Sequence, residues 1–397
     1  MPPYTLALLP GDGIGRDVMH EAEKILDVIE GLTPLTFIRK TIPCGGQYYL
    51  ETGEEWPTGS FDFCRDEADA ILLGAVGWPD AFTPEGDLAG GQVILGLRSG
   101  LDLYANVRPI RLYDGVCHKI HGQFTQVWNS GSVDMTIIRE NTEGLYHSLL
   151  QRSADKAQGR PHTEPEAIPF AGLEGEVAWD PRPISRLGSE RVIRFAFDYA
   201  NRRNGAPVDG ISRVTCVDKS NVTRGCQLFR SIFQEIAMDN PNIETNLAYI
   251  DAFTMWLVRN PEEFDVVVTP NMFGDICTDL ASVLQGGMGL AASGNIGDNH
   301  AMFEPVHGSA PKYTGLNKTN PIAMISSVSM MLDWLGDTHQ DSDCKSVAIL
   351  LEKSIAQIIA QGEILTYDLG GTAGTTEVGE AIRGALTELL NEHYAVA

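Results

Sequence analysis

The fold is decided by the segment Tyr4-Thr-Leu-Ala-Leu-Leu-Pro-Gly-Asp-Gly-Ile-Gly-Arg-Asp-Val-Met-His-Glu-Ala-Glu-Lys-Ile-Leu-Asp-Val-Ile29. Its apolar run at 4–9 predicts a strand, the glycines at 11–15 predict a tight turn, and apolar residues at helical spacing over 17–29 predict an amphipathic helix. The same alternation of strand and helix continues along the chain. It predicts an α/β protein whose central sheet is largely parallel.

Further elements follow from the same patterns. Strands are predicted at 35–39, 70–74, 133–138, 213–217 and 264–269, and helices at 189–203, 226–238, 322–335 and 344–361. Residues 147–186 contain several prolines and scattered charges without a period, which predicts an insertion or excursion loop with room for a short hairpin. The glycine-rich residues 286–297 and the segment 304–311 are expected to be ligand loops.

The composition describes a large globular protein with an acidic surface. Its 397 residues, 43% hydrophobic and 21% charged, suffice for two or three domains. The 29 Lys and Arg against 53 Asp and Glu give a net charge of −24, which repels nucleic acids and anionic membranes. Seven cysteines without a C-x-x-C pair, and no apolar stretch near the roughly 18 residues of a membrane span, favour a soluble, cytoplasmic protein.

The glycines at 11–15 lack the spacing of a dinucleotide-binding fingerprint. That fingerprint is G-x-G-x-x-G with an acidic residue about 20 positions later, whereas the third glycine here, Gly15, comes one residue early. The spacing favours a plain tight turn. Any cofactor site is therefore expected to be of a non-Rossmann kind.

Three arginines stand in or beside strand-like segments of this acidic chain: Arg98, Arg108 and Arg139. Arg108 precedes Pro109, and Arg139 ends the apolar run 133–138. We therefore expect both guanidinium groups at strand C-terminal ends, where α/β folds bind ligands. An isolated arginine is more often a surface charge, but three that converge suit a di- or tricarboxylate.

Asp275 and Asp279 are four residues apart at an expected helix start, so their carboxylates share one face and repel each other. A divalent cation would relieve the repulsion, and oxygen ligands favour Mg²⁺ or Mn²⁺ over zinc. An acidic first turn that complements the helix dipole is an equally good explanation of Asp275.

Two further pairs of residues could take part in catalysis or in ligand binding. Tyr146 and Lys219 could handle protons together, because desolvation and nearby cations lower the pKa of a lysine. Lys312 and Tyr313, in an expected loop, suit an extra phosphate next to a ribose. Each of these residues can also be structural or solvated.

Five motifs occur in one order along the chain. They are Leu97-Arg-x-x-Leu-Asp-Leu-Tyr-Ala-Asn-Val-Arg-Pro109, Arg139-Glu-Asn-Thr-Glu-Gly-Leu-Tyr146, Val217-Asp-Lys-Ser-Asn221, Asn271-Met-Phe-Gly-Asp-x-x-x-Asp279 and Gly294-Asn-Ile-Gly-Asp298 through Pro311. Together they resemble the β-decarboxylating dehydrogenases, the family of the isocitrate, 3-isopropylmalate, homoisocitrate and tartrate/D-malate dehydrogenases. The resemblance extends from Leu8 to about Ile382 and is weakest over 147–186.

The resemblance implies the isocitrate/isopropylmalate dehydrogenase-like fold, with two α/β domains around a cleft and central sheets flanked by helices. Residues 1–104 and 286–397 would form a large cofactor-binding domain, and residues 105–285 a smaller domain for substrate binding and dimerisation. Helices containing 251–258 and 276–284 hold more apolar residues than one core-facing stripe needs, so we expect them at a dimer interface. Burial within the monomer is the alternative.

The resemblance also implies roles in a reaction. Arg98, Arg108 and Arg139 would hold the carboxylates of a malate-like substrate, Tyr146 would protonate the enolate, and Lys219 would act as base at the hydroxyl. Hydride would pass from C2 of the substrate to the nicotinamide, and the C3 carboxylate would leave as CO₂.

The implied ligands of Mg²⁺ or Mn²⁺ are Asp251, Asp275 and Asp279, and Asp251 would also take part in catalysis. In the family, the residues that correspond to Lys219 and Asp251 come from the partner subunit. The implied active unit is therefore a homodimer with two shared sites.

The family's cofactor loop corresponds to residues 304–320, and its nicotinamide-side loop to 74–77. The implied cofactor contacts are Gly74, Ala75, Glu304, His307, Gly308, Ser309, Ala310, Lys312, Tyr313, Asn320 and Tyr367. NAD-using members usually carry Asp-Ile where this chain has Lys312-Tyr313, and a cation there favours a 2′-phosphate. Tyr367 matches another NADP-associated position, although the arginine expected four residues later is Gly371. We expect NADP to be preferred, with some use of NAD.

Substrate choice in the family depends on side chains just before the first arginine, here Gln92, Ile94 and Leu95. The Ser-x-Asn pattern of isocitrate enzymes would fall on Gln92 and Ile94, and the homoisocitrate arginine on Leu95; both are missing. Ile94 and Leu95 offer an apolar wall that favours 3-isopropylmalate or another alkylmalate. Isocitrate, then tartrate or D-malate, are the alternatives, because Gln92 could donate to a polar group.

Two functions of other classes stay open. A non-catalytic regulatory homologue would bind carboxylates without turnover, which the presence of all the implied catalytic and metal residues disfavours. A metal-dependent lyase without net redox change would need no nucleotide loop. Accumulation of NADPH distinguishes both from an oxidative decarboxylation.

Overall fold

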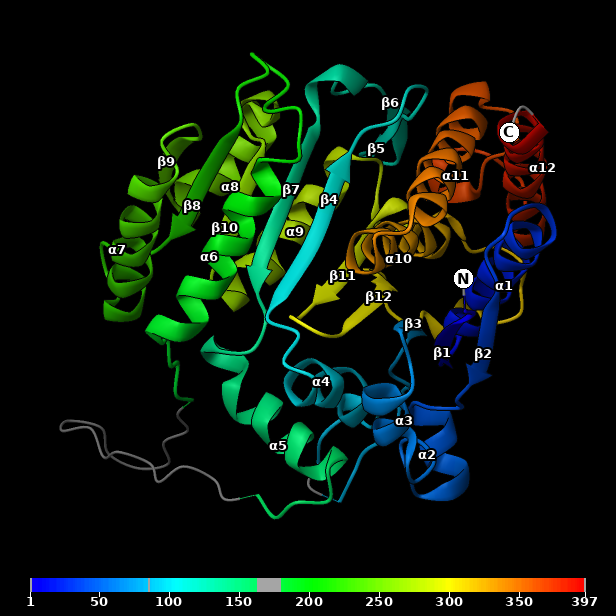
Figure 1. Ribbon diagram of the computed structural model, residues 1–397, viewed down its shortest axis with the longest axis horizontal. Helices are drawn as coiled ribbons and strands as arrows, with labels where there is room; N and C mark the ends of the chain where they lie inside the picture. The colour runs from blue at the N-terminus through cyan, green and yellow to red at the C-terminus, as the bar shows by residue number, and fades with distance from the viewer. Residues whose placement is uncertain (1, 85, 163–179, 396–397) are drawn as a thin grey trace.

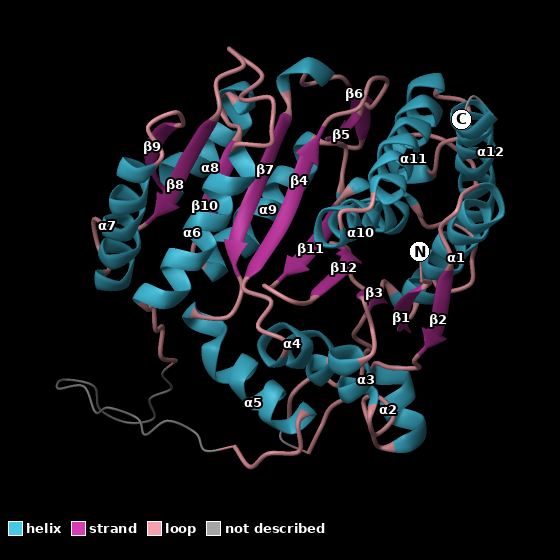
Figure 2. Cartoon of the chain, in the orientation of Figure 1, coloured by secondary structure: helices cyan, strands magenta, loops and turns pink. Residues whose placement is uncertain are grey.

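The computed structural model describes residues 2–84, 86–162 and 180–395 (Figure 2). Its strands are β1 (Tyr4–Gly11), β2 (Phe37–Thr41), β3 (Ala70–Ala75), β4 (Ala105–Arg111), β5 (His118–Ile120), β6 (Gln123–Thr125), β7 (Asp134–Glu140), β8 (Arg213–Asp218), β9 (Glu244–Tyr249), β10 (Val266–Thr269), β11 (Ala292–Ile296) and β12 (Ala301–Pro305). Its α-helices are α1 (Ile14–Leu32), α2 (Gly46–Thr52), α3 (Ser60–Asp66), α4 (Gly91–Gly100), α5 (His147–Ala157), α6 (Arg186–Ala200), α7 (Arg224–Asp239), α8 (Ile250–Arg259), α9 (Asn271–Leu284), α10 (Ile322–His339), α11 (Ser342–Gln361) and α12 (Thr375–Ala395).

One ten-stranded sheet runs through the molecule in the order β2-β1-β3-β12-β11-β4-β7-β10-β8-β9 (Figure 1). Six neighbouring pairs are parallel, and the three pairs that join β12, β11, β4 and β7 at the centre are antiparallel. Helices cover both faces, with α6 in front of β7 and β10 and α9 behind them in Figure 1. The predicted α/β class and the largely parallel sheet are confirmed.

The antiparallel centre corrects the predicted position of Arg108. Arg108 lies in the middle of β4, opposite Ile137 of β7, and not at a strand end. Arg139 lies one residue from the carboxyl end of β7 and pairs with Asn106. Because residues two apart on a strand share a face, Arg108 still lies on the same side of the sheet as Arg139.

A buried carboxylate holds the turn between β1 and α1. Asp12 accepts hydrogen bonds from the backbone N–H groups of Gly46, Gln47 and Gly77, at 2.7, 2.8 and 2.8 Å. Gly13 has a φ of 56°, in the left-handed region that glycine adopts at low cost. The turn at 11–15 therefore ties β1 to two neighbouring loops, as the tight-turn interpretation predicts.

Two predicted loops contain regular structure. Residues 147–157, the start of the expected insertion, form α5, which packs on α4 where Ser153 and Ala157 lie against Gly96. Residues 163–179, where a hairpin was an option, lie outside the described residues. The glycine-rich residues 286–297 include the central strand β11, in which Gly294 leaves room for the ring of Phe303 on β12.

The strand order suits the predicted division into two domains. In the order of the sheet, the first five strands, β2, β1, β3, β12 and β11, come from residues 1–104 and 286–397. The other five, β4, β7, β10, β8 and β9, come from residues 105–285. One buried cluster, around Phe197, Phe229 and Phe233, lies within residues 105–285 except for Tyr104, whereas the largest cluster includes residues of both groups. The division stays a prediction.

The seven cysteines are free thiols, and six of them are buried. Burial raises the pKa of Cys44 and of Cys277 to about 12, so these thiols stay protonated. The predicted reducing, cytoplasmic setting stays a prediction. In the part of the chain that the structure describes, no helix has the length and apolar character needed to cross a membrane.

Candidate active site

The arginines and two of the aspartates singled out from the sequence come together beside the antiparallel centre of the sheet. Arg98 of α4, Arg108 of β4 and Arg139 of β7 are all buried. Asp275 of α9 forms an ion pair with Arg139 and lies 3.8 Å from Arg108. Asp279 lies 3.7 Å from Arg108. Two carboxylates thus face two guanidinium groups.

The three arginines of this cluster are crowded together and repel one another. Burial, followed by repulsion from Arg108 and Arg98, lowers the pKa of Arg139 to about 10. Burial and Arg98 also lower the pKa of Arg108. The Nε–H of Arg98 is buried and has no hydrogen-bond partner among the described residues. Buried cations and an unpaired donor favour an anionic ligand that carries more than one carboxylate.

Asp275 and Asp279 lie one turn apart on α9, as their spacing predicts. Burial opposes ionisation of Asp275, but Arg139 and Arg108 outweigh it and lower its pKa. Burial raises the pKa of Asp279, although Arg108 works against the rise, and repulsion from Asp275 adds to it. A divalent cation would be attracted to this pair of oxygen donors, so the donor set fits Mg²⁺ or Mn²⁺.

The third predicted metal ligand is not part of this pair. Asp251, at the start of α8, is exposed and forms an ion pair at 2.6 Å with Lys219. Within the described residues, no group of three His, Cys, Asp or Glu side chains could hold a metal ion. The expected set of three aspartates is therefore not assembled inside one chain.

The predicted proton-transfer residues also have separate partners. The hydroxyl of Tyr146 donates to Asp275 at 3.0 Å. Burial, together with Asp275, raises the pKa of Tyr146, so the phenol stays protonated. Lys219 instead contacts Asp251, so the Tyr146 and Lys219 pair expected from the sequence is not in contact among the described residues of one chain.

A buried polar network that the sequence reasoning missed holds Arg98 in place. Arg98 donates to Glu304 of β12 at 2.6 Å, and Asn295 of β11 donates to the same carboxylate at 2.8 Å. Asn106 of β4 donates to Asn295 and accepts from Arg108, both at 2.8 Å. Glu304, expected as a cofactor contact, thus pairs with a predicted substrate residue. The signal in the sequence is a polar residue inside each apolar strand.

Two side chains of α9 complete the support of the arginines. Asn271 accepts a hydrogen bond from Nε of Arg139 at 2.9 Å, and Thr278 accepts one from Arg108 at 2.5 Å. Both lie in the sequence motif 271–279, which also contains Asp275, and their place in that motif could have identified them as site residues from the sequence. They fix the direction of the guanidinium groups without adding charge.

The segments expected to bind the cofactor meet beside the turn at 11–15. The backbone N–H of Ile14 donates to the carbonyl of Ser309 at 2.9 Å, and the Ser309 hydroxyl donates to the carbonyl of Gly77. Gly74 and Ala75 end β3 next to the same turn, where the N–H of Asp12 donates to the carbonyl of Ala75 at 2.6 Å. Three separate segments are thus held together by backbone hydrogen bonds.

The loop after β12 contains several of the residues expected to contact the cofactor. Nε2 of His307, next to Gly308, is buried and has no hydrogen-bond partner in the part of the chain that the structure describes, and burial lowers the pKa of His307. Ala310 has a left-handed φ of 36°. Asn320 donates to Asp368 at 3.1 Å and is buried, so its side chain anchors the end of the loop.

The residues expected near a 2′-phosphate also lie together. The rings of Tyr313 and Tyr367 have centroids 5.7 Å apart, and Nζ of Lys312 lies 4.8 Å from the Tyr313 centroid. A second cation, Lys318, lies 4.7 Å from the Tyr367 centroid. The sequence reasoning did not single out Lys318.

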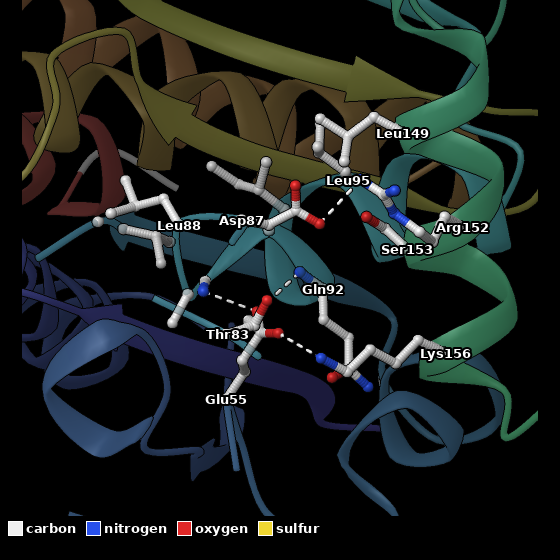
Figure 3. A pocket seen from close by; sticks show the side chains of 16 residues that line it. Glu55, Thr83, Asp87, Leu88, Gln92, Leu95, Leu149, Arg152, Ser153 and Lys156 are labelled. Carbon is white, nitrogen blue, oxygen red and sulfur yellow. Dashed lines mark hydrogen bonds and ion pairs between the residues drawn. The ribbon is translucent and has the colours of Figure 1, made fainter. Parts of the chain in front are cut away.

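A pocket of about 410 Å³ lies between α4 and α5 (Figure 3). The predicted specificity residues Gln92, Ile94 and Leu95 line it from α4, and Leu149, Arg152, Ser153 and Lys156 line it from α5. Glu55 holds the first turn of α4 by accepting from the N–H groups of Gly90 and Gln92 at 2.6 and 2.9 Å. It also forms an ion pair with Lys156 at 3.1 Å. The pocket combines an apolar wall with paired charges.

Comparison with known proteins assigns this arrangement to a class of enzyme. Residues 5–382 match the family model described as isocitrate/isopropylmalate dehydrogenase, and the chain belongs to that family. It is therefore a β-decarboxylating dehydrogenase, in a family that in general depends on a metal ion and a nicotinamide cofactor. The family and the fold that the five motifs predict are confirmed.

Similar proteins match over almost their full lengths. The chain is 38% identical to a 3-isopropylmalate dehydrogenase of Thermobifida fusca, over 96% of this chain and 98% of that protein. It is 35% identical to a 3-isopropylmalate/3-methylmalate dehydrogenase of Methanocaldococcus jannaschii, over 97% and 99%. Among solved structures, an isocitrate dehydrogenase from Methylococcus capsulatus has a TM-score of 0.77 and 33% identity, with 97% and 99% of the two chains covered. A β-decarboxylating dehydrogenase from Thermococcus kodakarensis has a TM-score of 0.73 and 35% identity, with 98% of each chain covered.

Proposed function

We propose that the protein oxidatively decarboxylates a malate with an alkyl group on C3, such as 3-isopropylmalate, and prefers NADP over NAD. The observation that carries the proposal is the apolar wall of Ile94 and Leu95, on the same helix as the buried Arg98. Two similar proteins have names that specify 3-isopropylmalate or 3-methylmalate. Isocitrate, the substrate in the name of one structural neighbour, is the alternative, because Gln92 could donate to a polar group.

The arginine cluster explains how the substrate would be bound. Arg98, Arg108 and Arg139 would bind the two carboxylates of the malate core, and the free Nε–H of Arg98 would gain an acceptor. Lys219 of the partner subunit would take the proton of the C2 hydroxyl as hydride leaves C2 for the nicotinamide. After CO₂ leaves, Tyr146, protonated because its pKa is raised, would donate a proton to C3.

Asp275 and Asp279 would hold the divalent cation, together with Asp251 of the partner subunit. When bound, Mg²⁺ or Mn²⁺ supplies a Lewis acid that stabilises negative charge on the substrate oxygens. Asp275 also orients Arg139 and accepts from Tyr146, so one carboxylate links the metal, substrate and proton-donor positions.

We propose a homodimer because one chain holds an incomplete site. Lys219 and Asp251 pair with each other and not with Tyr146 or Asp275. The neighbouring helices α8 and α9 leave large apolar side chains exposed, among them Met255, Trp256, Ile276 and Val283. Exposed apolar patches of this kind usually mark an interface. A second copy that covers α8 and α9 would bury them and supply the missing residues.

Cofactor preference is tested by Lys312→Asp combined with Tyr313→Ile. We expect the ratio of kcat/KM for NADP to that for NAD to fall by about 10²-fold, because a carboxylate repels the 2′-phosphate and accepts from ribose hydroxyls. Initial rates with each cofactor measure the ratio. Lys353→Asp, which changes an exposed lysine of α11 in the same way, is the control. An unchanged ratio in the double variant would reject the NADP proposal.

The reaction itself is tested by following the absorbance of the reduced nicotinamide in the presence of Mn²⁺. NAD and NADP are crossed with 3-isopropylmalate, isocitrate, homoisocitrate, D-malate and tartrate, with and without a chelator. We expect the fastest turnover with 3-isopropylmalate and NADP, and loss of activity with the chelator. Faster turnover of isocitrate would show the substrate assignment to be wrong. CO₂ release without reduced cofactor would indicate a lyase, and binding without turnover would indicate a regulatory homologue.

A further inference from the structure

Lys318 lies on a pair of tyrosine rings at the outer end of the cofactor loop. Its Nζ is 4.7 Å from the ring centroid of Tyr367 and 5.9 Å from that of Tyr313. Lys312 lies over Tyr313 at 4.8 Å, so two ammonium groups and two phenols form one cluster. The residues come from two segments separated by helices α10 and α11. A cation over an aromatic face is attracted by the ring and held near it.

The position of Lys318 is fixed by the residue before it. Asn317 has a left-handed φ of 50°, which asparagine tolerates better than most residues. Its backbone carbonyl accepts from the N–H of Thr375 at 3.2 Å, and its side chain accepts from the N–H of Thr376 at 2.9 Å. Asn317 thus binds the first turn of α12, and the chain continues directly into Lys318. These hydrogen bonds therefore fix the backbone next to Lys318.

Beside this cluster is a cavity of about 490 Å³ that Lys318, Tyr367, Gly371 and Glu377 help to line. A Cβ atom on Gly371 would lie 1.9 Å from the carbonyl oxygen of Leu365, so that position cannot hold a side chain without a backbone shift. The carboxylate of Glu377 accepts from the N–H of Gly374 at 2.6 Å. Lys318 is the cation that the structure places at this cavity.

The charges of Lys312 and Lys318 are available to a ligand. Lysines that form ion pairs in the described residues are Lys24, Lys156, Lys219 and Lys345. Lys312 and Lys318 are exposed, form no ion pair in that part of the chain and lie over aromatic faces. The pKa of Tyr313 is lowered, first by Tyr367 and then by Lys312, with Lys318 contributing. Positive potential at the Tyr313 phenol thus comes from both lysines.

We propose that Lys318 helps to determine cofactor choice, by binding the 2′-phosphate of NADP together with Lys312, Tyr313 and Tyr367. This inference rests on the proposed preference for NADP and adds a residue to it. A phosphate beside these two ammonium groups and the phenol hydroxyls would accept charge-assisted hydrogen bonds. NAD has no group to satisfy these donors, so Lys318 adds affinity only for NADP.

The test compares Lys318→Ala with Lys353→Ala, a control at an exposed lysine on α11. Calorimetry measures the Kd of adenosine 2′,5′-bisphosphate and of adenosine 5′-monophosphate, which lacks the 2′-phosphate. We expect Lys318→Ala to weaken the bisphosphate by about tenfold and to change the monophosphate by less than about twofold. In turnover, kcat/KM for NADP should fall by about tenfold and that for NAD should stay the same. Lys318→Arg, which keeps the charge, should retain most of the preference.

The outcomes separate this inference from the proposed function. If the unmodified enzyme favours NADP but Lys318→Ala binds the bisphosphate equally well, Lys318 is a packing residue and the inference is wrong. If the unmodified enzyme favours NAD, the proposed cofactor preference fails and the inference fails with it. Equal losses for both adenosine ligands would indicate a structural effect and would also overturn it. Thermal melting of each variant checks that the fold is retained.

Discussion

Co-expressing Lys219→Met and Tyr146→Phe with different affinity tags should give a mixed dimer with about half of wild-type activity, although each variant alone is nearly inactive. Each single substitution removes a proton-transfer group and should lower kcat by roughly 10²- to 10⁴-fold. In the mixed dimer, one site would receive both mutations. The other would combine an intact Tyr146 with an intact Lys219 of the partner subunit.

The reason for this expectation is the separation of the two groups within one chain. Tyr146 bonds to Asp275, whereas Lys219 forms an ion pair with Asp251. If the site is shared, each subunit contributes both its Lys219 and its Asp251 to the site of its partner. Recovery of activity in the doubly tagged dimer, measured with the preferred substrate and cofactor, tests this directly.

The matched control is the mixed dimer of Lys219→Met with Asp251→Asn. These residues contact each other at 2.6 Å, so they would enter the same site from the same subunit. Every site in that dimer would lack one of them, and activity should stay at the level of the single variants. Equal recovery in both mixtures, or recovery in neither, would contradict a shared site built in this way.

Asp275→Asn should lower kcat/KM by roughly 10³-fold and weaken Mn²⁺ binding by more than about 100-fold. Asp275 is the carboxylate closest to Arg139, lies 3.8 Å from Arg108, and accepts from Tyr146. The amide keeps the size of the side chain but loses the negative charge that attracts a cation. Without this carboxylate, less negative charge offsets the repulsion among the buried guanidinium groups.

Calorimetric titration with Mn²⁺ and initial rates measure the two effects. Asp239→Asn is the matched control, because this exposed aspartate at the end of α7 lies 4.0 Å from Arg194 and has no part in the arginine cluster. Unchanged Mn²⁺ affinity in Asp275→Asn would show that the acidic pair on α9 serves only to balance the arginines. The thermal midpoint of the variant distinguishes a lost ligand from a lost fold.

Sequence patterns predicted the parts of the fold that depend on local spacing. The period of apolar residues identified α1, α6, α7, α10 and α11, because one face of a helix repeats every 3 to 4 residues. The same rule placed Asp275 and Asp279 on one face of α9. Where apolar residues are few, as in α5, or glycines are dense, as in β11, the period is weak and both elements were missed.

The site required contacts between residues far apart in the chain. Arg98 and Glu304 are 206 positions apart and meet only because β12 lies in the centre of the sheet, where both are buried. The antiparallel register of β4 with β7 puts Arg108, in the middle of its strand, on the same face of the sheet as Arg139. The position of Lys318 over Tyr367 depends on how the loop after β12 packs against the start of α12.

The amino-acid sequence by itself determined the α/β class, the family and the chemical types that a carboxylate-binding dehydrogenase needs, because these follow from periodicity and from residues within single motifs. Only the tertiary structure decided which charges face each other, that Lys219 pairs with Asp251, and that Lys318 joins the tyrosine pair. The physical reason is that burial and strand pairing act on the whole chain at once, so they bring together side chains whose proximity no local spacing encodes.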